Sequence, residues 1–275
     1  MRSPIINVMD RAARRAGRAM ARDFGEVQQL QVSKKGSKDF VGAATRKASE
    51  TLRYELSEAR PQFGFYGDVE GPSDPPANDQ PDGNHHWIAS PLDGTTNYLH
   101  GLPQFAMSIA HEEDGHLVEA IIYDPLRDEL FWAIRNTGAF LNDTRLRVSA
   151  RQHLNISVIA TGMPHFDHGD HPRHLATLAP VMADSAGIRD FGAPALDLAY
   201  VAAGRVDGFW HFGLPPQDIA AGILMVREAG GFITDFEGRN TMMTGGDVVA
   251  ANDQLHDRLL GCIRTADPGP TPEDG

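Results

Sequence analysis

The sequence contains a single cysteine and no long run of apolar residues. With only Cys262 present, an intrachain disulfide and a metal site built from several thiolates are both excluded. We expect the Cys262 thiol to be a buried apolar group near the C-terminal end. Since no segment reaches the roughly 18 consecutive apolar residues of a membrane helix, we expect no membrane insertion and a cytoplasmic location.

The chain also has fewer basic than acidic residues. It contains 25 Lys and Arg residues and 37 Asp and Glu residues, which gives a net charge of -12. This balance argues against a broad electrostatic surface for nucleic acid or an anionic membrane, so no direct nucleic-acid partner is expected. A protein partner stays open. Hydrophobic residues make up 41% of the chain, enough for one large core or two modest subdomains.

The first part of the chain carries the periodicity of amphipathic helices. Over residues 4–24 apolar side chains recur at helical spacing, with arginines on the opposite face. A second helix is predicted over about 44–59, where apolar residues line up every four positions. The stretch 71–86 is rich in Pro, Asp, Asn and Gly and ends in His85 and His86, so it predicts an exposed loop.

From Trp87 onward the pattern changes to short apolar runs bounded by turn residues, which predicts consecutive antiparallel strands. Later segments alternate strand-like runs with helical ones, as in the second half of an α/β protein. The predicted strands cover residues 106–110, 118–123, 129–133 and 138–141, and the later helices cover 195–203 and 218–229.

The stretch 87–103 carries the chemistry and reads WIASPLDGTTNYLHGLP. A strand that ends in Asp93 and is followed by Gly94 and Thr95 places a carboxylate beside free backbone N–H groups at a helix or turn start. That combination suits a metal-bound phosphate. Taken alone, Asp-Gly-Thr is also an ordinary turn, so the surrounding residues decide.

Those residues closely resemble W-x-I-D-P-I-D-G-T-T-N-F-x-H-G, the long and specific motif of the inositol monophosphatase family. Residues 217–222 are similar to a second motif of that family, W-D-x-A-A-G. The segments 123–130, 138–142, 189–204 and 228–231 also resemble family segments, so the resemblance covers nearly the whole chain.

The resemblance implies a fold, an assembly and a reaction. Family members form an alternating α-β-α-β-α sandwich, usually dimerise, and hydrolyse phosphomonoesters with Mg2+ ions and a metal-bound water. We therefore expect a homodimer of one domain over residues 1–265, with subdomains of approximately 1–150 and 151–265. A disordered tail is expected over 266–275.

The resemblance also implies a site. Asp93 and Asp218 match two metal-binding aspartates, and Leu92 matches a position whose backbone carbonyl is a ligand. Gly94 and Thr95 match the phosphate-contacting pair. Thr95 further matches the catalytic position whose hydroxyl orients the nucleophilic water.

Other ligand positions depart from the family pattern. Ser90 stands where the family has an aspartate that bridges two metals, and Thr45 replaces the aspartate that partners the water-orienting threonine. Asp68 falls at the place of a glutamate ligand, with Glu70 as the alternative. A neutral hydroxyl is a poor replacement for a carboxylate at a Mg2+ site.

The substrate side departs as well. Ala193 falls in the segment that resembles the substrate-contacting G-x-A-A-L-D run, which Pro194 interrupts. His211 occupies the position of a substrate-binding glutamate, and Gln217 that of a tryptophan. Recognition of the sugar is therefore expected to differ from the family pattern.

These losses fall on one small site, whereas scaffold motifs elsewhere stay close to the family. We expect an impaired or inactive homologue with weak or absent Mg2+ binding and a binding or assembly role. The alternative is an active Mg2+-dependent phosphatase for inositol monophosphate or a related sugar phosphomonoester, with one metal held by Asp68, Asp93 and Asp218. A third reading is a small-molecule binder without hydrolysis. A bacterial branch of the family acts through RNA polymerase, a precedent for a protein partner.

The remaining histidines favour ordinary structural roles. Histidines 165, 168, 171 and 174 lie at spacing three, a density that suits zinc. Gly169 and Pro172 interrupt a regular helix there, so an exposed polar loop is expected. His100 is expected to make a structural hydrogen bond in its turn. Ser90 has no adjacent base in the sequence and is not expected to be a nucleophile.

Overall fold

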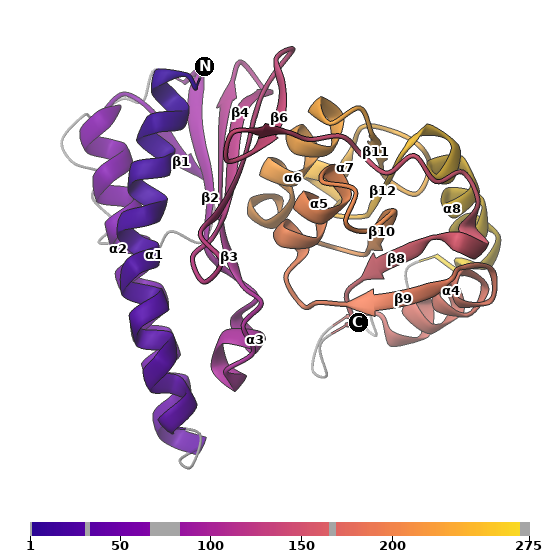
Figure 1. Ribbon diagram of the computed structural model, residues 1–275, viewed down its shortest axis with the longest axis horizontal. Coiled ribbons are helices and arrows are strands. Elements are labelled where there is room, and N and C mark those ends of the chain that lie inside the picture. Colours follow the sequence, from indigo (N-terminus) through magenta and orange to yellow (C-terminus); the bar gives the residue numbers. More distant parts are fainter. Residues whose placement is uncertain (1, 31–33, 67–82, 165–168, 270–275) are drawn as a thin grey trace, which may run out of the picture.

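The computed structural model describes residues 2–30, 34–66, 83–164 and 169–269, apart from the side chains of residues 26–40. Within these ranges helices and sheets alternate in five layers (Figure 1). Two long helices cover one face of a seven-stranded sheet, two helices lie between this sheet and a five-stranded one, and two more cover the far side. The layered α-β-α-β-α prediction is confirmed.

The outer layer consists of α1 (Pro4–Leu30) and α2 (Lys34–Ala59). Their apolar stripes pack against the sheet, with Met9 and Leu52 fully buried in one cluster with Trp87. Both predicted helices exist, but α1 extends beyond residue 24 and α2 begins well before residue 44. A glycine inside a helix costs only about 1 kcal/mol, so Gly36 and Gly42 do not end α2.

The seven strands of the first sheet follow one another in sequence order. All neighbouring pairs are antiparallel except β1 and β2, so the predicted run of antiparallel strands is confirmed. The strands are β1 (Gly64–Tyr66), β2 (His85–Asp93), β3 (Ala106–Glu113), β4 (His116–Asp124), β5 (Glu129–Ile134), β6 (Gly138–Leu141) and β7 (Thr144–Arg145).

The prediction that His85 and His86 belong to a loop is wrong, because both open strand β2. The His85 ring stacks on Phe63 with centroids 4.6 Å apart, and its Nδ1 lies 3.0 Å from Nε2 of His111. Aromatic cover and a cross-strand hydrogen bond thus support His85 at the strand start. The rest of the predicted loop falls largely outside the described residues.

The second sheet has the order β11-β12-β10-β8-β9, and β8, β9 and β10 are parallel. Parallel neighbours need crossover connections, which α4 and α5 provide. The strands are β8 (Val158–Thr161), β9 (Gly187–Asp190), β10 (Gly208–His211), β11 (Phe232–Thr234) and β12 (Val248–Ala251). The helices outside the first layer are α3 (Thr95–His100), α4 (His171–Asp184), α5 (Pro194–Ala202), α6 (Pro216–Glu228), α7 (Met242–Gly245) and α8 (Asp253–Ala266), with a 3-10 turn at Leu154–Ile156.

Helix α4 corrects the prediction of a polar loop at the histidine-rich segment. His171 opens the helix and His174 is buried within it. Asp170 caps the helix by accepting a hydrogen bond from the Arg173 N–H at 3.0 Å. Pro172 lies in the first turn, where its missing N–H costs nothing. The other two histidines of that segment lie outside the described residues.

The middle layer, α5 and α6, is buried nearly all round. Its helices approach so closely that a Cβ on Gly222 would lie 2.4 Å from Cδ1 of Leu198. Both sheets bury their inner faces on this layer in one cluster of apolar side chains. Helices that are apolar all round belong in a core, and here they hold the site-bearing ends of the two sheets together.

The structure corrects two predictions near the C-terminal end, the burial of Cys262 and the start of the tail at residue 266. Cys262 is half-buried, with its sulfur 3.7 Å from Oδ2 of Asp184, and burial raises the pKa of its thiol. Helix α8 includes Ala266, the first residue of the predicted tail, whereas residues 270–275 lie outside the described range. In the part of the chain that is described, no helix has the length and apolar character to cross a membrane.

Candidate functional site

The corner between β2 and α3 depends on Gly94. This residue has a φ of 88° and precedes the first turn of α3. A Cβ there would lie 2.8 Å from the Gln104 carbonyl oxygen and 3.3 Å from Cβ of Ala193. Only glycine fits this left-handed, crowded position. The corner therefore brings two predicted phosphate- and substrate-contacting positions, Gly94 and Ala193, side by side.

Asp93 is the last residue of β2, and its carboxylate is buried against the first turn of α5. Oδ2 accepts hydrogen bonds from the backbone N–H groups of Ala195 and Leu196 at 2.9 and 3.3 Å. Burial raises the pKa of Asp93 well above its ordinary value, and the charge of Asp218 raises it further. The two aspartates predicted as metal ligands thus lie close enough to repel one another.

The N-terminus of α5 has little capacity left for an outside anion. Pro194 occupies its first turn and has no N–H, and the next two N–H groups already bind Asp93. The carboxylate of Asp93 therefore takes the place that a bound anion takes at an open helix N-terminus.

Ser90 lies on the face of the first sheet that meets the start of α6. It is 4% exposed and stands directly opposite Ser108 on β3. The Ser108 hydroxyl donates to the Gln217 carbonyl at 3.3 Å, and Gln217 precedes Asp218 in the first turn of α6. Opposite residues of an antiparallel pair share a face, so Ser90 points to the same region. Where the resemblance places a bridging carboxylate, this chain has a buried neutral hydroxyl.

The two threonines of the predicted water-orienting pair bond to backbone carbonyls. Thr45 is half-buried in α2, and its hydroxyl donates to the Val41 carbonyl at 2.9 Å. Thr95 opens α3, and its hydroxyl donates to the Leu92 carbonyl at 3.3 Å. The Leu92 oxygen, predicted as a metal ligand, thus already accepts one hydrogen bond. Thr45 offers no carboxylate to activate a water.

Sequence reasoning missed Asp197, a carboxylate in the first turn of α5. It has no exposed surface, and neither side-chain oxygen has a hydrogen-bond partner. Burial, followed by the charge of Asp93, raises its pKa well above the ordinary value, which favours the protonated carboxyl group. The available signal was a lone acidic residue inside an otherwise apolar helix.

His211 ends β10 at the carboxyl edge of the parallel strands, the edge at which α/β sheets place ligands. Its ring covers Gly162, where an added Cβ would lie 2.5 Å from both Cδ2 and Nε2. Nδ1 donates to the Phe212 carbonyl at 2.8 Å, and burial lowers the pKa of the ring. A neutral imidazole therefore stands where the resemblance places a carboxylate.

The described residues supply few oxygen ligands for a Mg2+ ion. Asp93, Asp218 and the Leu92 carbonyl are available, whereas Asp68 and Glu70 lie outside the described residues. Within the described ranges, no group of three or more His, Cys, Asp or Glu side chains is placed to hold a metal. Mg2+ prefers about six oxygen ligands and usually keeps several waters, so these three protein oxygens would fill only part of its coordination shell.

Comparisons with known proteins agree on one family. The family model described as "Inositol monophosphatase family" matches residues 1–267. An inositol-1-monophosphatase of Mesorhizobium japonicum is 51% identical over 263 residues, covering 96% of this chain and 97% of the relative. The Nus factor SuhB of Escherichia coli K12 is 39% identical over 265 residues, covering 95% and 96%.

Solved structures are similar over the same length. The extragenic suppressor protein suhB of Bartonella henselae superposes with a TM-score of 0.85 at 49% identity, covering 95% of this chain and 99% of that one. An inositol monophosphatase of Anabaena gives a TM-score of 0.81 at 30% identity, covering 96% of each chain. The names of these similar proteins thus include both enzymes and a Nus factor.

Proposed function

Because the chain belongs to the inositol monophosphatase family, we propose that it is a member with a weakened or inactive metal site, whose retained surface serves in binding or assembly. The observation that carries the proposal is the buried hydroxyl of Ser90 beside the start of α6, where a bridging carboxylate is expected. Without that negative charge, clustered Mg2+ ions lose the ligand that offsets their mutual repulsion.

The position of Thr45 supports the same conclusion. Its hydroxyl is bonded within α2, so the carboxylate that partners Thr95 in the family pattern has no substitute there. Losing even an outer partner of a metal site typically costs about 10-fold to 100-fold in affinity or activity.

The raised pKa of Asp93 adds a further obstacle to metal binding. A carboxylate must be deprotonated to bind Mg2+, so a proton competes with the ion at this residue. Since Oδ2 also holds the first turn of α5, ligation of that oxygen competes with two backbone hydrogen bonds.

Calorimetric titration with Mg2+, together with phosphate release from inositol 1-phosphate, tests the proposal. The wild type is compared with a Thr45→Asp, Ser90→Asp double variant and with a Thr51→Asp control on the exposed side of α2. We expect no turnover by the wild type or the control, and a gain in Mg2+ binding and turnover in the double variant. Mg2+-dependent turnover by the wild type contradicts the proposal.

A weak single-metal phosphatase is the second candidate, and the pair Asp93 and Asp218 favours it. The charge of Asp218 raises the pKa of Asp93, and two carboxylates that repel one another gain from a cation placed between them. Turnover that requires Mg2+ and is abolished by Asp93→Asn supports this candidate. A third candidate binds a phosphomonoester at Gly94 and Thr95 without hydrolysis, and ligand-induced thermal stabilisation without phosphate release identifies it.

The remaining expectations belong to the same proposal. We propose a cytoplasmic homodimer that binds a protein partner, as the name of the Nus factor relative suggests. The two sheets support a division into subdomains near residues 1–150 and 151–265 within one domain. Sedimentation tests whether the chain forms a homodimer, and partial proteolysis tests the division into two subdomains.

A further inference from the structure

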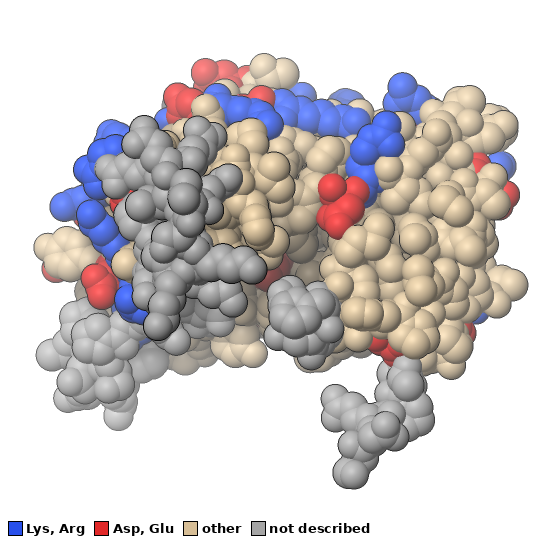
Figure 2. Space-filling model, turned by 90° about the horizontal axis from the view of Figure 1, so that it is seen from below, with Lys and Arg blue, Asp and Glu red and all other residues tan. Residues whose placement is uncertain are grey.

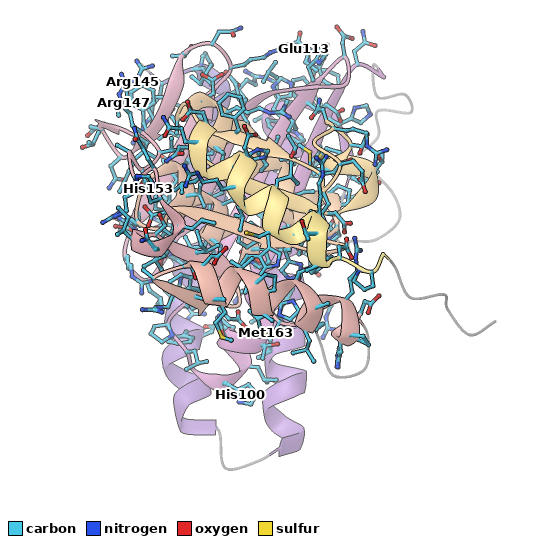
Figure 3. All side chains as sticks on the ribbon, turned by 90° about the vertical axis from the view of Figure 1, so that its right-hand side faces the viewer. His100, Glu113, Arg145, Arg147, His153 and Met163 are labelled. Atoms are coloured by element: carbon cyan, nitrogen blue, oxygen red, sulfur yellow. The ribbon has the colours of Figure 1, made fainter. Side chains whose placement is uncertain are left out.

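The far side of the second sheet carries a groove between α8 and the end of α4. Figure 2 shows few Lys, Arg, Asp or Glu side chains over most of the right-hand half, the half that holds the second sheet and its helices. Figure 3 shows α4 and α8 on the face turned to the viewer, with His153 at the edge of that face. His153 and the 3-10 turn that follows it also line the groove.

The groove is large enough for a small molecule. Its volume is about 750 Å3, and volumes of about 300–1,000 Å3 are typical of small-ligand sites. Gly261 in α8 deepens it, since an added Cβ there would have nothing within 4 Å. Leu154 and Pro180 add apolar surface that suits CH2 groups. The groove shares no residue with the site around Asp93.

Arg258 supplies positive charge to the groove. Its Nη1 lies 3.5 Å from Nδ1 of His153, so the guanidinium lies beside another residue of the groove wall. A guanidinium group only donates hydrogen bonds, so Nδ1 of His153 is the acceptor here and the neutral ring carries its proton on Nε2. The other N–H groups of Arg258 suit an anion, and a carboxylate fits their planar fork well.

Asp184 supplies negative charge to the same groove. Its Oδ2 lies 3.7 Å from Sγ of Cys262, and burial together with this carboxylate raises the pKa of the thiol. Asp184 is also the last residue of α4, and the C-terminal end of a helix favours a cation. An ammonium group therefore suits this position.

The two charges are separated along the groove. In the described part of the chain, Arg258 and Asp184 form no ion pair with each other or with another residue. Arg258 and Cys262 are four residues apart on α8, so their Cβ atoms are about 5–6 Å apart. The carboxylate beside Cys262 thus lies about one helical turn from the base of the arginine. A ligand with opposite charges at its two ends can contact both.

We propose that this groove binds a small zwitterion, an ω-amino acid whose carboxylate contacts Arg258, whose ammonium group contacts Asp184 and whose CH2 chain covers Gly261. An α-amino acid carries both charges on one carbon, so it is too short to contact both residues. A ligand with two anionic groups fits less well, because Asp184 repels the second group. This inference goes beyond the proposed binding or assembly role and does not depend on the state of the metal site.

Cys262 reports directly on the groove, because it lines the groove and is the one cysteine of the chain. The full chain is alkylated with iodoacetamide, a neutral reagent, with and without 5-aminopentanoate. A pH of about 8.5 keeps the amine protonated. The ion pairs are exposed, so we expect a dissociation constant on the order of 10 mM. The alkylation rate should then fall about 6-fold at about 50 mM ligand.

Matched ligands and variants test the two charges. Pentanoate and pentylamine each lack one charge and should slow alkylation about 2-fold or less. In Arg258→Gln and Asp184→Asn the ratio of the rates without and with 5-aminopentanoate should fall to about 2, since each variant loses one ion pair. Arg145→Gln and Asp143→Asn remove the same charges at exposed positions of the first sheet and should keep the wild-type ratio. Each ratio is taken within one variant, so a change in thiol reactivity cancels.

Gly261→Leu tests the hollow over α8. The added side chain fills that space, so the ratio should fall to about 1, and thermal unfolding checks that each variant folds. Three results overturn the proposal: no slowing by 5-aminopentanoate, equal slowing by pentanoate or pentylamine, or wild-type ratios in Arg258→Gln and Asp184→Asn. Stronger slowing by the capped peptide acetyl-Glu-Ala-Ala-Lys-amide would assign the groove to a protein partner and also overturn it.

Discussion

Arg173 and Asp267 form a two-pronged ion pair that joins the start of α4 to the chain after α8. Nε and Nη2 of Arg173 donate to Oδ1 and Oδ2 of Asp267, each at 2.7 Å. Nη2 also donates to Asp247 at 2.9 Å, and the guanidinium lies over the Phe212 ring at 4.4 Å. One arginine thus holds four separate segments of the second half of the chain.

Arg173→Lys is therefore expected to destabilise the protein despite keeping the charge. An ammonium group cannot reproduce the planar fork or the stacking on Phe212. We expect a loss of about 2–4 kcal/mol in the free energy of unfolding, measured by urea denaturation. Arg189→Lys, at an exposed site, is the control and should change stability by less than about 0.5 kcal/mol. Equal effects of the two changes would contradict this role for Arg173.

Asp197→Asn is expected to stabilise the protein at neutral pH. Because the folded-state pKa of Asp197 lies above its unfolded value, the folded protein holds the proton more tightly, and the stability from this group is lost as pH rises. Asparagine stays neutral and removes that loss. The expected gain is about 1–2 kcal/mol at pH 7, and it should shrink toward zero as the pH falls below about 4.

Urea unfolding from acid to neutral pH measures this effect. The matched control is Asp143→Asn, which neutralises an exposed carboxylate in the turn between β6 and β7. A stability difference between wild type and Asp197→Asn that does not change with pH would show that Asp197 is ionised in the folded protein.

Gly222→Ala is expected to destabilise the middle layer. The added methyl group would lie 2.6 Å from Cβ of Leu198, so α5 and α6 must separate. Overpacking of this kind costs about 1–3 kcal/mol. Gly261→Ala in α8 is the matched control, since nothing lies within 4 Å of its added Cβ. In that helix alanine should stabilise by about 0.5–1 kcal/mol, so thermal midpoints that shift the same way for both variants would refute the argument.

Asn97→Ala is expected to loosen the contact between α3 and the segment before α5. The Asn97 amide donates to the carbonyls of Gln104 and Phe191 at 2.8 and 2.6 Å. Removing it leaves two acceptors without this donor, at a cost of about 1–3 kcal/mol. Hydrogen exchange near residues 191–196 should rise more than exchange in α8, and unchanged exchange would contradict the prediction.

The first sheet was predictable because its strands are apolar runs separated by turns, and this pattern directly reflects burial on a pleated surface. The start of α4 was not, because Pro172 signals a break unless the first helical turn is already known. His85 was misassigned for a related reason. Its support comes from Phe63 and His111, which lie far from it in the sequence or on another strand.

The candidate site was only partly predictable. The motif around Asp93 named Gly94, and the structure brings Gly94 against Ala193 from a distant segment. The motif gave no indication that the Asp93 carboxylate accepts hydrogen bonds from the first turn of α5. Asp197 was missed because a lone acidic residue in an apolar helix is a weak signal, and its lack of a hydrogen-bond partner is recognisable only when the surrounding layers are in place.

The hydrogen bonds from α5 to Asp93 connect the last residue of the first sheet's second strand to the helix that leads into β10. Protonation of Asp93, or a cation bound to Oδ2, draws electron density from the oxygen that accepts both N–H groups. The charge of Asp93 therefore affects how strongly these hydrogen bonds hold the two sheets together. An ion that enters this site competes with the protein's own backbone for the same lone pairs.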